Sequence, residues 1–274
     1  MLILVKTAMI ALVIAVALPL LVQVQAYPRL SKIADGVYTY EQADPTKRGV
    51  AVNNLIVVTP EGVLVGDGQG TVENTKRLVD DIAGVTSQPI RYVVVGSIHG
   101  DHRGGDAAFP SGVTFVKTKT DLTLGGRDIR VLFLGRAHTG SDLEVFLPRE
   151  RIMYMSESFS NDIFPSMANG YPSEWIAALR RAEEMPVDVY MPAHSPQANT
   201  RLYMTRDDVR KYRSALEMVL GEGRRLHDTR VPVEEAAAGA NFGDISSWIR
   251  RPENAAAALK RVYLELDGQL KPES

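Results

Sequence analysis

A buried strand that ends in a cluster of polar residues constrains this chain more than any other feature of its sequence. Residues 90–95 are largely apolar and follow Pro89, which is typical of a short strand buried on both faces of a sheet. Residues 97–105 follow at once and read Ser-Ile-His-Gly-Asp-His-Arg-Gly-Gly. Two histidines and an aspartate therefore stand where the strand stops and its backbone must turn sharply. This order of residues predicts a site at the end of a sheet.

Strands and helices alternate along the chain around this segment. Apolar or alternating runs of strand length predict strands at residues 36–40, 54–58, 63–65, 142–147, 152–155 and 187–191, with short strands within 113–133. Apolar residues at helical spacing predict helices at residues 71–83, 174–185, 206–226 and 252–266, the second of them capped by Ser173. Strands and helices that interleave in two halves fit an α/β fold whose sheets are covered by helices on their outer faces.

The first 26 residues have the pattern of a cleaved signal peptide. Lys6 precedes a charge-free apolar run over residues 8–22, and residues 24–26 (Val-Gln-Ala) have the small side chains that a signal peptidase reads. The apolar run is shorter than the roughly 20 residues that a membrane-spanning helix needs, and Pro19 interrupts it. We therefore favour cleavage after residue 26 over retention of the segment as a membrane anchor.

The remaining chain, residues 27–274, has the composition of one globular domain. Hydrophobic residues make up 45% and charged residues 23% of the full sequence, and we expect the helices from about residue 206 onward to pack on the preceding part. The net charge of -2 comes from interspersed charges without a block of Lys or Arg, which argues against a nucleic-acid partner. The absence of cysteine agrees with an oxidising compartment. We expect a periplasmic or secreted protein with no stable membrane span after cleavage, whose partner is a small-molecule substrate; the oligomeric state stays open.

Most of the histidines lie in segments that could supply a metal site. Four of the five stand beside small or acidic residues after predicted strands, namely His99, His102, His138 and His194. A single histidine at a strand end is more often a hydrogen-bonded core or surface residue than a ligand. Four histidines in such segments along the chain, together with Asp101, are much stronger evidence for a metal site than any one of them alone. The fifth, His227, lies in a polar segment after a long helix and is interpreted as structural.

These segments resemble the metal-binding segments of metallo-β-lactamase-like hydrolases. Such hydrolases carry His-x-His-x-Asp-His at this strand end, and the present sequence matches at His99, Asp101 and His102 but has Ser97 in place of the first histidine. Glu157 stands where the family usually shows Gly-Asp, or Cys, after a strand. The resemblance extends over roughly residues 33–197 and implies a four-layer αββα sandwich.

The resemblance also implies a zinc site, since zinc is bound by imidazoles and carboxylates and catalytic zinc keeps three protein ligands plus a water. One position, here named the aspartate position, would be formed by Asp101, His102 and His194. Glu157 is the candidate fourth or bridging ligand, although it is one methylene longer than the usual aspartate. We expect this position to be well formed.

The second position, here named the histidine position, would be weaker. It keeps only His99 and His138, because the Ser97 hydroxyl stays neutral and is a poor metal ligand. Asp67 and Asp142 could orient the imidazoles through their second ring nitrogen, or could serve in turns and caps. The expected cofactor is thus Zn²⁺, in one or two positions, with iron and manganese kept as alternatives.

The activity that the resemblance implies is hydrolysis of an ester, lactone, thioester or amide bond, including β-lactam-like amides. A metal-bound hydroxide would attack the carbonyl group, and the metal would stabilise the developing oxyanion. Asp101 or Glu157 would accept the proton of the nucleophile. His99 and His138 would complete the second position or would instead hydrogen-bond the tetrahedral intermediate. The alternative from another class is a non-catalytic periplasmic binding protein that keeps the fold with a degenerate metal site. A mononuclear iron dioxygenase is a third hypothesis.

Overall fold

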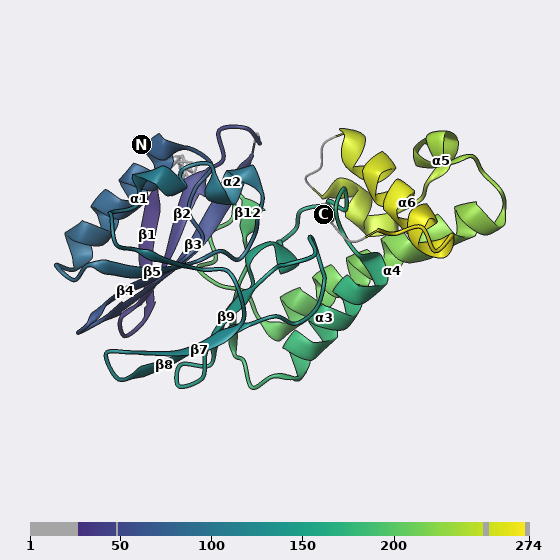
Figure 1. The fold of residues 1–274 in the computed structure, drawn as a ribbon. Coiled ribbons are helices and arrows are strands. Elements are labelled where there is room, and N and C mark those ends of the chain that lie inside the picture. Colours follow the sequence, from purple (N-terminus) through teal and green to yellow (C-terminus); the bar gives the residue numbers. More distant parts are fainter. Residues whose placement is uncertain (1–26, 48, 249–251, 272–274) are drawn as a thin grey trace, which may run out of the picture.

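Two β-sheets packed face to face form the centre of the computed structural model, which describes residues 27–47, 49–248 and 252–271 (Figure 1). The predicted signal peptide lies outside the described residues. The first sheet has seven strands, in the order β1 (Arg29–Ala34), β2 (Val37–Ala43), β3 (Val50–Thr59), β4 (Gly62–Gly66), β5 (Ile90–Val94) and β6 (Thr114–Val116), with β12 (His194–Pro196) also paired to β3. The second sheet has five strands, in the order β11 (Val189–Met191), β10 (Ile152–Tyr154), β9 (Glu144–Leu147), β8 (Arg127–Leu132) and β7 (Thr120–Leu124).

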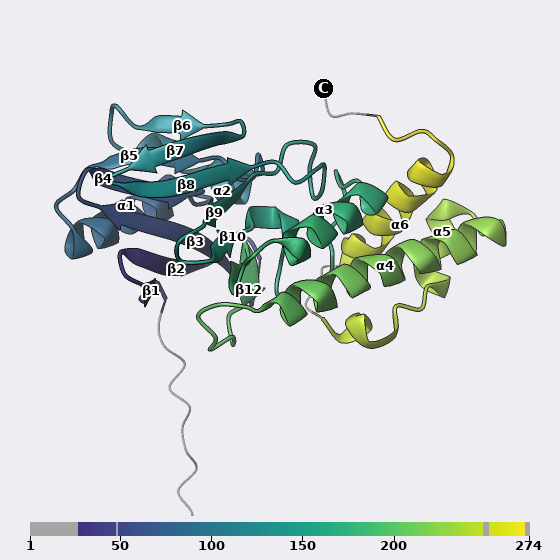
Figure 2. The ribbon, with the colours of Figure 1, turned by 90° about the horizontal axis from the view of Figure 1, so that it is seen from below.

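Helices cover the outer faces of both sheets. They are α1 (Val72–Val85), α2 (Gly100–Arg103), α3 (Pro172–Glu184), α4 (Arg206–Asp228), α5 (Val233–Gly239) and α6 (Pro252–Leu266), with short 3-10 turns η1 (Asp106–Ala108), η2 (Ser156–Ser158) and η3 (Gly243–Ser247). Helix α1 buries Leu78 and Ile82 in a cluster with Val65 of the first sheet. Helix α3 buries Trp175 and Leu179 with side chains of the second sheet. Helices α4 and α6 pack on α3 and on each other, and α5 packs on α6 and α4 (Figure 2).

A third apolar cluster lies between the two sheets. It joins Leu55 and Leu64 of the first sheet to Val145 and Leu147 of the second, all of them fully buried. Removing such side chains from water contributes about 1.5–3 kcal/mol each, so the sheet interface anchors the whole molecule. Helix, sheet, sheet and helix follow one another as four layers, which confirms the αββα expectation.

Most expected elements are present, and several details differ. Helix α3 begins at Pro172 with Tyr171 at its cap, so the expectation that Ser173 caps this helix is wrong. Proline suits the first helical position because its φ is already helical and that position needs no amide donor. The elements β1, α2, α5 and β12 were not expected; β12 has only three residues, which carry no readable periodicity. Within the part of the chain that the structure describes, no helix combines the length and apolarity needed to cross a membrane.

Candidate metal centre

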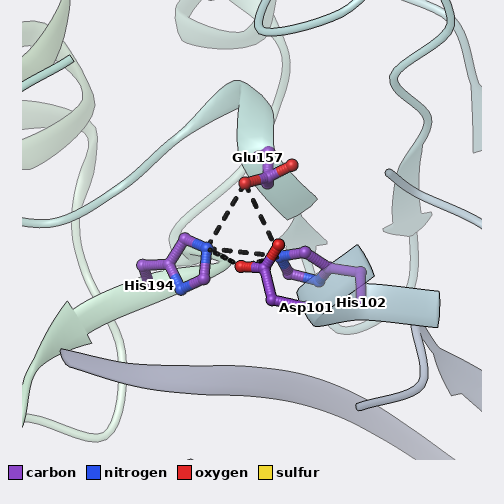
Figure 3. A group of neighbouring side chains, drawn as sticks. All are labelled: Asp101, His102, Glu157 and His194. Carbon is purple, nitrogen blue, oxygen red and sulfur yellow. Dashed lines mark hydrogen bonds and ion pairs between the residues drawn. The ribbon is translucent and has the colours of Figure 1, made fainter. Parts of the chain in front are cut away.

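The site lies where strands of both sheets end. Strand β5 runs parallel to β4 and β6 and leads into the segment that carries His99 and α2. Glu157 follows β10 in η2, and His194 begins β12, which the antiparallel pairing of His194 with Val52 holds beside β3. Figure 3 shows Asp101 and His102 from α2 facing His194, with Glu157 pointing at them from the second sheet. Side chains more than 90 residues apart in sequence thus converge at one point, as in the pair His102 and His194.

The donor atoms of the aspartate position lie close together. The Nε2 atoms of His102 and His194 are 3.3 Å apart, and Asp101 Oδ2 is 3.1 Å from His194 Nε2. Glu157 Oε1 lies 3.3 Å from His194 Nε2 and 3.8 Å from His102 Nε2. One ligand atom from each of these four side chains falls within 4.8 Å of all the others, so a single ion could contact all four.

The histidine position brings together His99, His138 and Glu157, the candidate bridging ligand. His99 Nδ1 is 2.7 Å from Glu157 Oε2, His138 Nε2 is 3.3 Å from Glu157 Oε1, and the two ring nitrogens are 3.1 Å apart. These three groups also lie within 4.8 Å of one another. Because Glu157 belongs to both groups, its carboxylate is placed to bridge two ions.

Local backbone geometry brings Glu157 into this place. Ser156, just before it, has a φ of 44°, and its hydroxyl donates a 2.5 Å hydrogen bond to Asp67 Oδ2. The turn packs so tightly against the end of β5 that a Cβ atom on Gly96 would lie 2.6 Å from the Cβ of Ser156. A glycine at this point is thus required for the two sheet ends to meet.

Asp67 supports the loop after β5 and also approaches one imidazole of the site. Its Oδ1 accepts hydrogen bonds from the backbone amides of Gly96 and Ser97 at 2.6 and 3.2 Å. Its Oδ2 accepts one from Tyr154 Oη at 2.7 Å and lies 3.3 Å from His102 Nδ1, which orients the other ring nitrogen toward the site. The sequence did not single out Tyr154, because a tyrosine in a buried strand carries no signal for such a contact.

Asp142 serves in a turn, which is the second of the two roles that the sequence allowed for it. Its two carboxylate oxygens accept hydrogen bonds from the Thr139 backbone amide at 2.7 Å and from the Thr139 hydroxyl at 2.9 Å. Asp142 therefore fixes the turn that presents His138. The His194 ring is held separately, with its Nδ1 3.2 Å from the backbone oxygen of Ala51. Each imidazole of the site thus has a partner or packing neighbour that sets its orientation.

Most side chains of the two donor groups are buried, and their charges interact strongly with one another. Burial acts to raise the pKa of Glu157, but the imidazoles of His138 and His102 hold it well below its usual value. For His102, burial opposes protonation, yet the carboxylates of Glu157, Asp67 and Asp101 together outweigh it and raise the pKa to about 9. The hydrogen bond to Glu157 likewise raises the pKa of His99. An incoming cation must therefore displace protons from these rings.

The donor set fits a divalent transition-metal ion. Imidazole nitrogens face one another in pairs, and carboxylate oxygens complete each group, which is the mixture of ligands that zinc accepts. Two imidazoles that face each other can form at most one hydrogen bond between them, so convergence of four rings on one buried carboxylate is poorly explained by hydrogen bonding alone.

Lys47 is a further residue of the site that the sequence did not indicate. Lys47, in the loop between β2 and β3, donates a hydrogen bond from its Nζ to Asp101, and the same atom lies 3.4 Å from His194 Nε2. A lysine in a loop has no distinguishing pattern in sequence, since nearly all lysines of globular proteins lie at the surface. Only the folded chain shows that this ammonium group meets the aspartate position.

A cavity of about 550 Å³ opens above the two groups. His99, Asp101, His138, Glu157 and His194 border it on one side. Its other walls come from the loop before α3, from α4 and from the start of α6, with apolar contributions from Val50, Ile163, Phe164, Ala168, Tyr212 and Ala257. Such a volume suits a small organic molecule.

The sheet order and the two donor groups define the molecule as having the metallo-β-lactamase fold. Its structure matches that of a metallo-β-lactamase from Pontibacter korlensis with a TM-score of 0.61 and 22% sequence identity, over 69% of this chain and 99% of that chain. A curated relative, 2,4-dinitroanisole O-demethylase subunit alpha of Nocardioides sp. (strain JS1661), is 23% identical over 93 residues. Those residues are 34% of this chain and only 28% of that subunit. No protein-family model matches the chain.

Proposed function

We propose that this protein is an exported, zinc-dependent hydrolase that cleaves an ester, lactone, thioester or amide bond of a small molecule. The observation that carries the proposal is the convergence of four histidines and two carboxylates on the floor of one cavity. The predicted signal peptide supports export to the periplasm or the medium.

The residues divide naturally into those that would hold an ion and those that a substrate could reach. Asp101, His102, His194 and Glu157 would hold an ion at the aspartate position, and His99, His138 and Glu157 a second one at the histidine position. A bound divalent cation lowers the pKa of a water ligand to about 7 and polarises a carbonyl group. That is the chemistry needed for hydrolysis at neutral pH.

Exposure suggests what each side chain does during the reaction. The side chains of Glu157 and His102 are 4% and 0% exposed, so they form the floor. Asp101 is 15% exposed and borders the cavity, which places its carboxylate to accept a proton from the nucleophile. His99 and His138 also border the cavity, where the N–H of a ring that holds no ion can donate a hydrogen bond to a developing oxyanion.

The cavity walls favour a substrate with an apolar portion. Ile163, Phe164 and Ala257 offer carbon surface away from the ligand side chains. Burial of a substrate alkyl or aryl group there would be favourable by about 0.8 kcal/mol for each methylene removed from water. Because the start of α6 supplies part of this wall, the C-terminal helices take part in choosing the substrate.

The test combines metal analysis with hydrolysis on the same samples. Mature wild-type protein, residues 27–274, should bind zinc stoichiometrically and hydrolyse at least one of a β-lactam, a lactone and a thioester reporter. The activated aryl ether 2,4-dinitroanisole belongs in the panel because of the name of the relative described above. Asp101→Ala should lose both zinc and activity. Protein that neither carries zinc nor gains it on addition contradicts the proposal, and zinc binding without turnover of the panel favours a binding protein.

A further inference from the structure

Lys47 occupies an unusual place for a cation. Its Nζ donates a hydrogen bond to Asp101 Oδ2, the same oxygen that lies 3.1 Å from His194 Nε2. The ammonium group is itself 3.4 Å from that ring nitrogen. Lys47 therefore contacts two of the donor atoms that a metal ion at the aspartate position would use.

A second carboxylate, that of Asp44, lies beside the same lysine. Asp44 Oδ2 is 3.7 Å from Lys47 Nζ, and the Asp44 side chain is only 1% exposed. Among the described residues, none forms a hydrogen bond with this buried oxygen. The other oxygen, Oδ1, is occupied by the backbone amides of Thr46 and Lys47 and by the Thr46 hydroxyl, at 2.7, 3.2 and 2.7 Å. Asp44 is thus fixed in position with one acceptor still available.

We propose that Lys47 acts as an internal counter-ion of the aspartate position, which a metal ion must displace from Asp101 toward Asp44. This inference rests on the metal centre proposed above. Its physical basis is competition between two cations for one carboxylate oxygen, combined with the cost of leaving a charge unpaired in a partly buried place. Asp44 lowers that cost because it offers the displaced ammonium group a partner within a short movement.

The arrangement has two consequences for metal affinity. Removing the ammonium group abolishes the competition, so the aspartate position binds zinc more tightly. Removing the charge of Asp44 leaves the displaced lysine without a partner, so the position binds zinc more weakly. The loss of zinc affinity on removing the Asp44 charge should occur only while Lys47 is present. A general effect of negative charge near the site would persist without Lys47.

The experiment is a double-mutant cycle on the mature protein with the zinc dissociation constant as its readout, measured by competition with a chromophoric chelator. Lys47→Met should tighten binding by about tenfold, at the lower end of effects known for residues around metal ligands. Asp44→Asn keeps the Oδ1 acceptor of the turn and should weaken binding several-fold. In the Lys47→Met background, Asp44→Asn should leave the constant unchanged.

Control variants distinguish failure of the Lys47 proposal from failure of the proposed metal centre. Lys76→Met removes one exposed positive charge, which pairs with Asp80 at 2.6 Å on α1, and should not alter zinc affinity. Lys47→Gln should act in the same direction as Lys47→Met. Equal or weaker zinc binding in Lys47→Met overturns the inference and leaves the metal centre standing. Absence of zinc from wild type and from Lys47→Met alike overturns both.

Discussion

The Ser97 hydroxyl donates a hydrogen bond to the carboxylate of Glu157. These are the two positions at which the chain departs from the metal-binding pattern that it otherwise resembles, and they are in direct contact. A serine where a histidine is usual leaves space at the end of β5, and a glutamate one methylene longer than aspartate extends into it. The two departures therefore form a matched pair, in which Glu157 supplies a ligand that both metal positions share.

This pairing predicts that the first histidine cannot be restored by one substitution. Ser97 is only 1% exposed, so in Ser97→His the imidazole would collide with the Glu157 carboxylate. We expect this variant to bind zinc at the histidine position no more tightly than wild type, while Ser97→His combined with Glu157→Asp should bind it more tightly there. Chelator competition on dialysed protein measures both affinities. Tighter binding in the single variant would show that the two side chains are independent.

Glu157 should matter more to metal binding than any single histidine. Glu157→Gln removes the charge shared by both positions and should weaken zinc binding at each by roughly 10- to 100-fold or more. Glu73→Gln, on the exposed side of α1 where Glu73 pairs with Arg77 at 2.7 Å, is the matched control. Chelator competition gives both affinities. Loss confined to one position would rule out a bridging carboxylate.

Zinc uptake should release protons. His102 has a pKa raised to about 9, so its ring holds a proton at pH 7 that a metal ligand cannot keep, and the pKa of His99 is raised in the same direction. Zinc affinity should therefore fall as the pH is lowered and level off as it rises above about 9. Titration calorimetry at pH 7 in two buffers of different ionisation enthalpy counts the released protons. Identical heats in both buffers would contradict the assignment.

Glu144 should make the fold less stable in alkaline solution. It is fully buried in β9, and burial raises its pKa to about 8 although Ser158 donates a 2.7 Å hydrogen bond to it. Between about pH 4.5 and 8 the folded state holds a proton that the unfolded state has lost, so stability falls as the pH rises through this window. Glu144→Gln cannot ionise and should exceed wild type by roughly 2–4 kcal/mol at pH 8.5. Urea unfolding at pH 5 should show little difference, and a constant gap at both values would refute this cause.

The apolar wall of the cavity should set the preference for substrate size. Ala257 of α6 borders the cavity, whereas the neighbouring Ala256 is exposed. With zinc-loaded protein, Ala257→Phe should lower kcat/KM for p-nitrophenyl octanoate by about tenfold or more and for p-nitrophenyl acetate much less. Ala256→Phe should change neither. Equal losses for both esters would mean that this wall does not contact the acyl chain.

Sequence patterns predicted the layers well because burial is periodic along each strand and helix. Residues 90–95 indicated a strand buried on both faces. Strand β5 occupies Ile90–Val94 with both of its neighbours parallel to it, but its Arg91 is exposed. The cap of α3 and the short strand β12 were missed, since their determinants are a single proline and a pairing with β3. Periodicity cannot report contacts that depend on one residue or on a distant partner.

Residue types and their order by themselves determined which side chains could bind a metal, because imidazoles and carboxylates at strand ends are chemically suited to it wherever they meet. Tertiary structure alone decided how those side chains are shared. Glu157 reaches both groups because β10 and β5 end side by side in packed sheets, and Lys47 reaches Asp101 because the loop after β2 folds over α2. Such contacts depend on how elements far apart in the chain are placed relative to one another. Local sequence patterns do not report that placement.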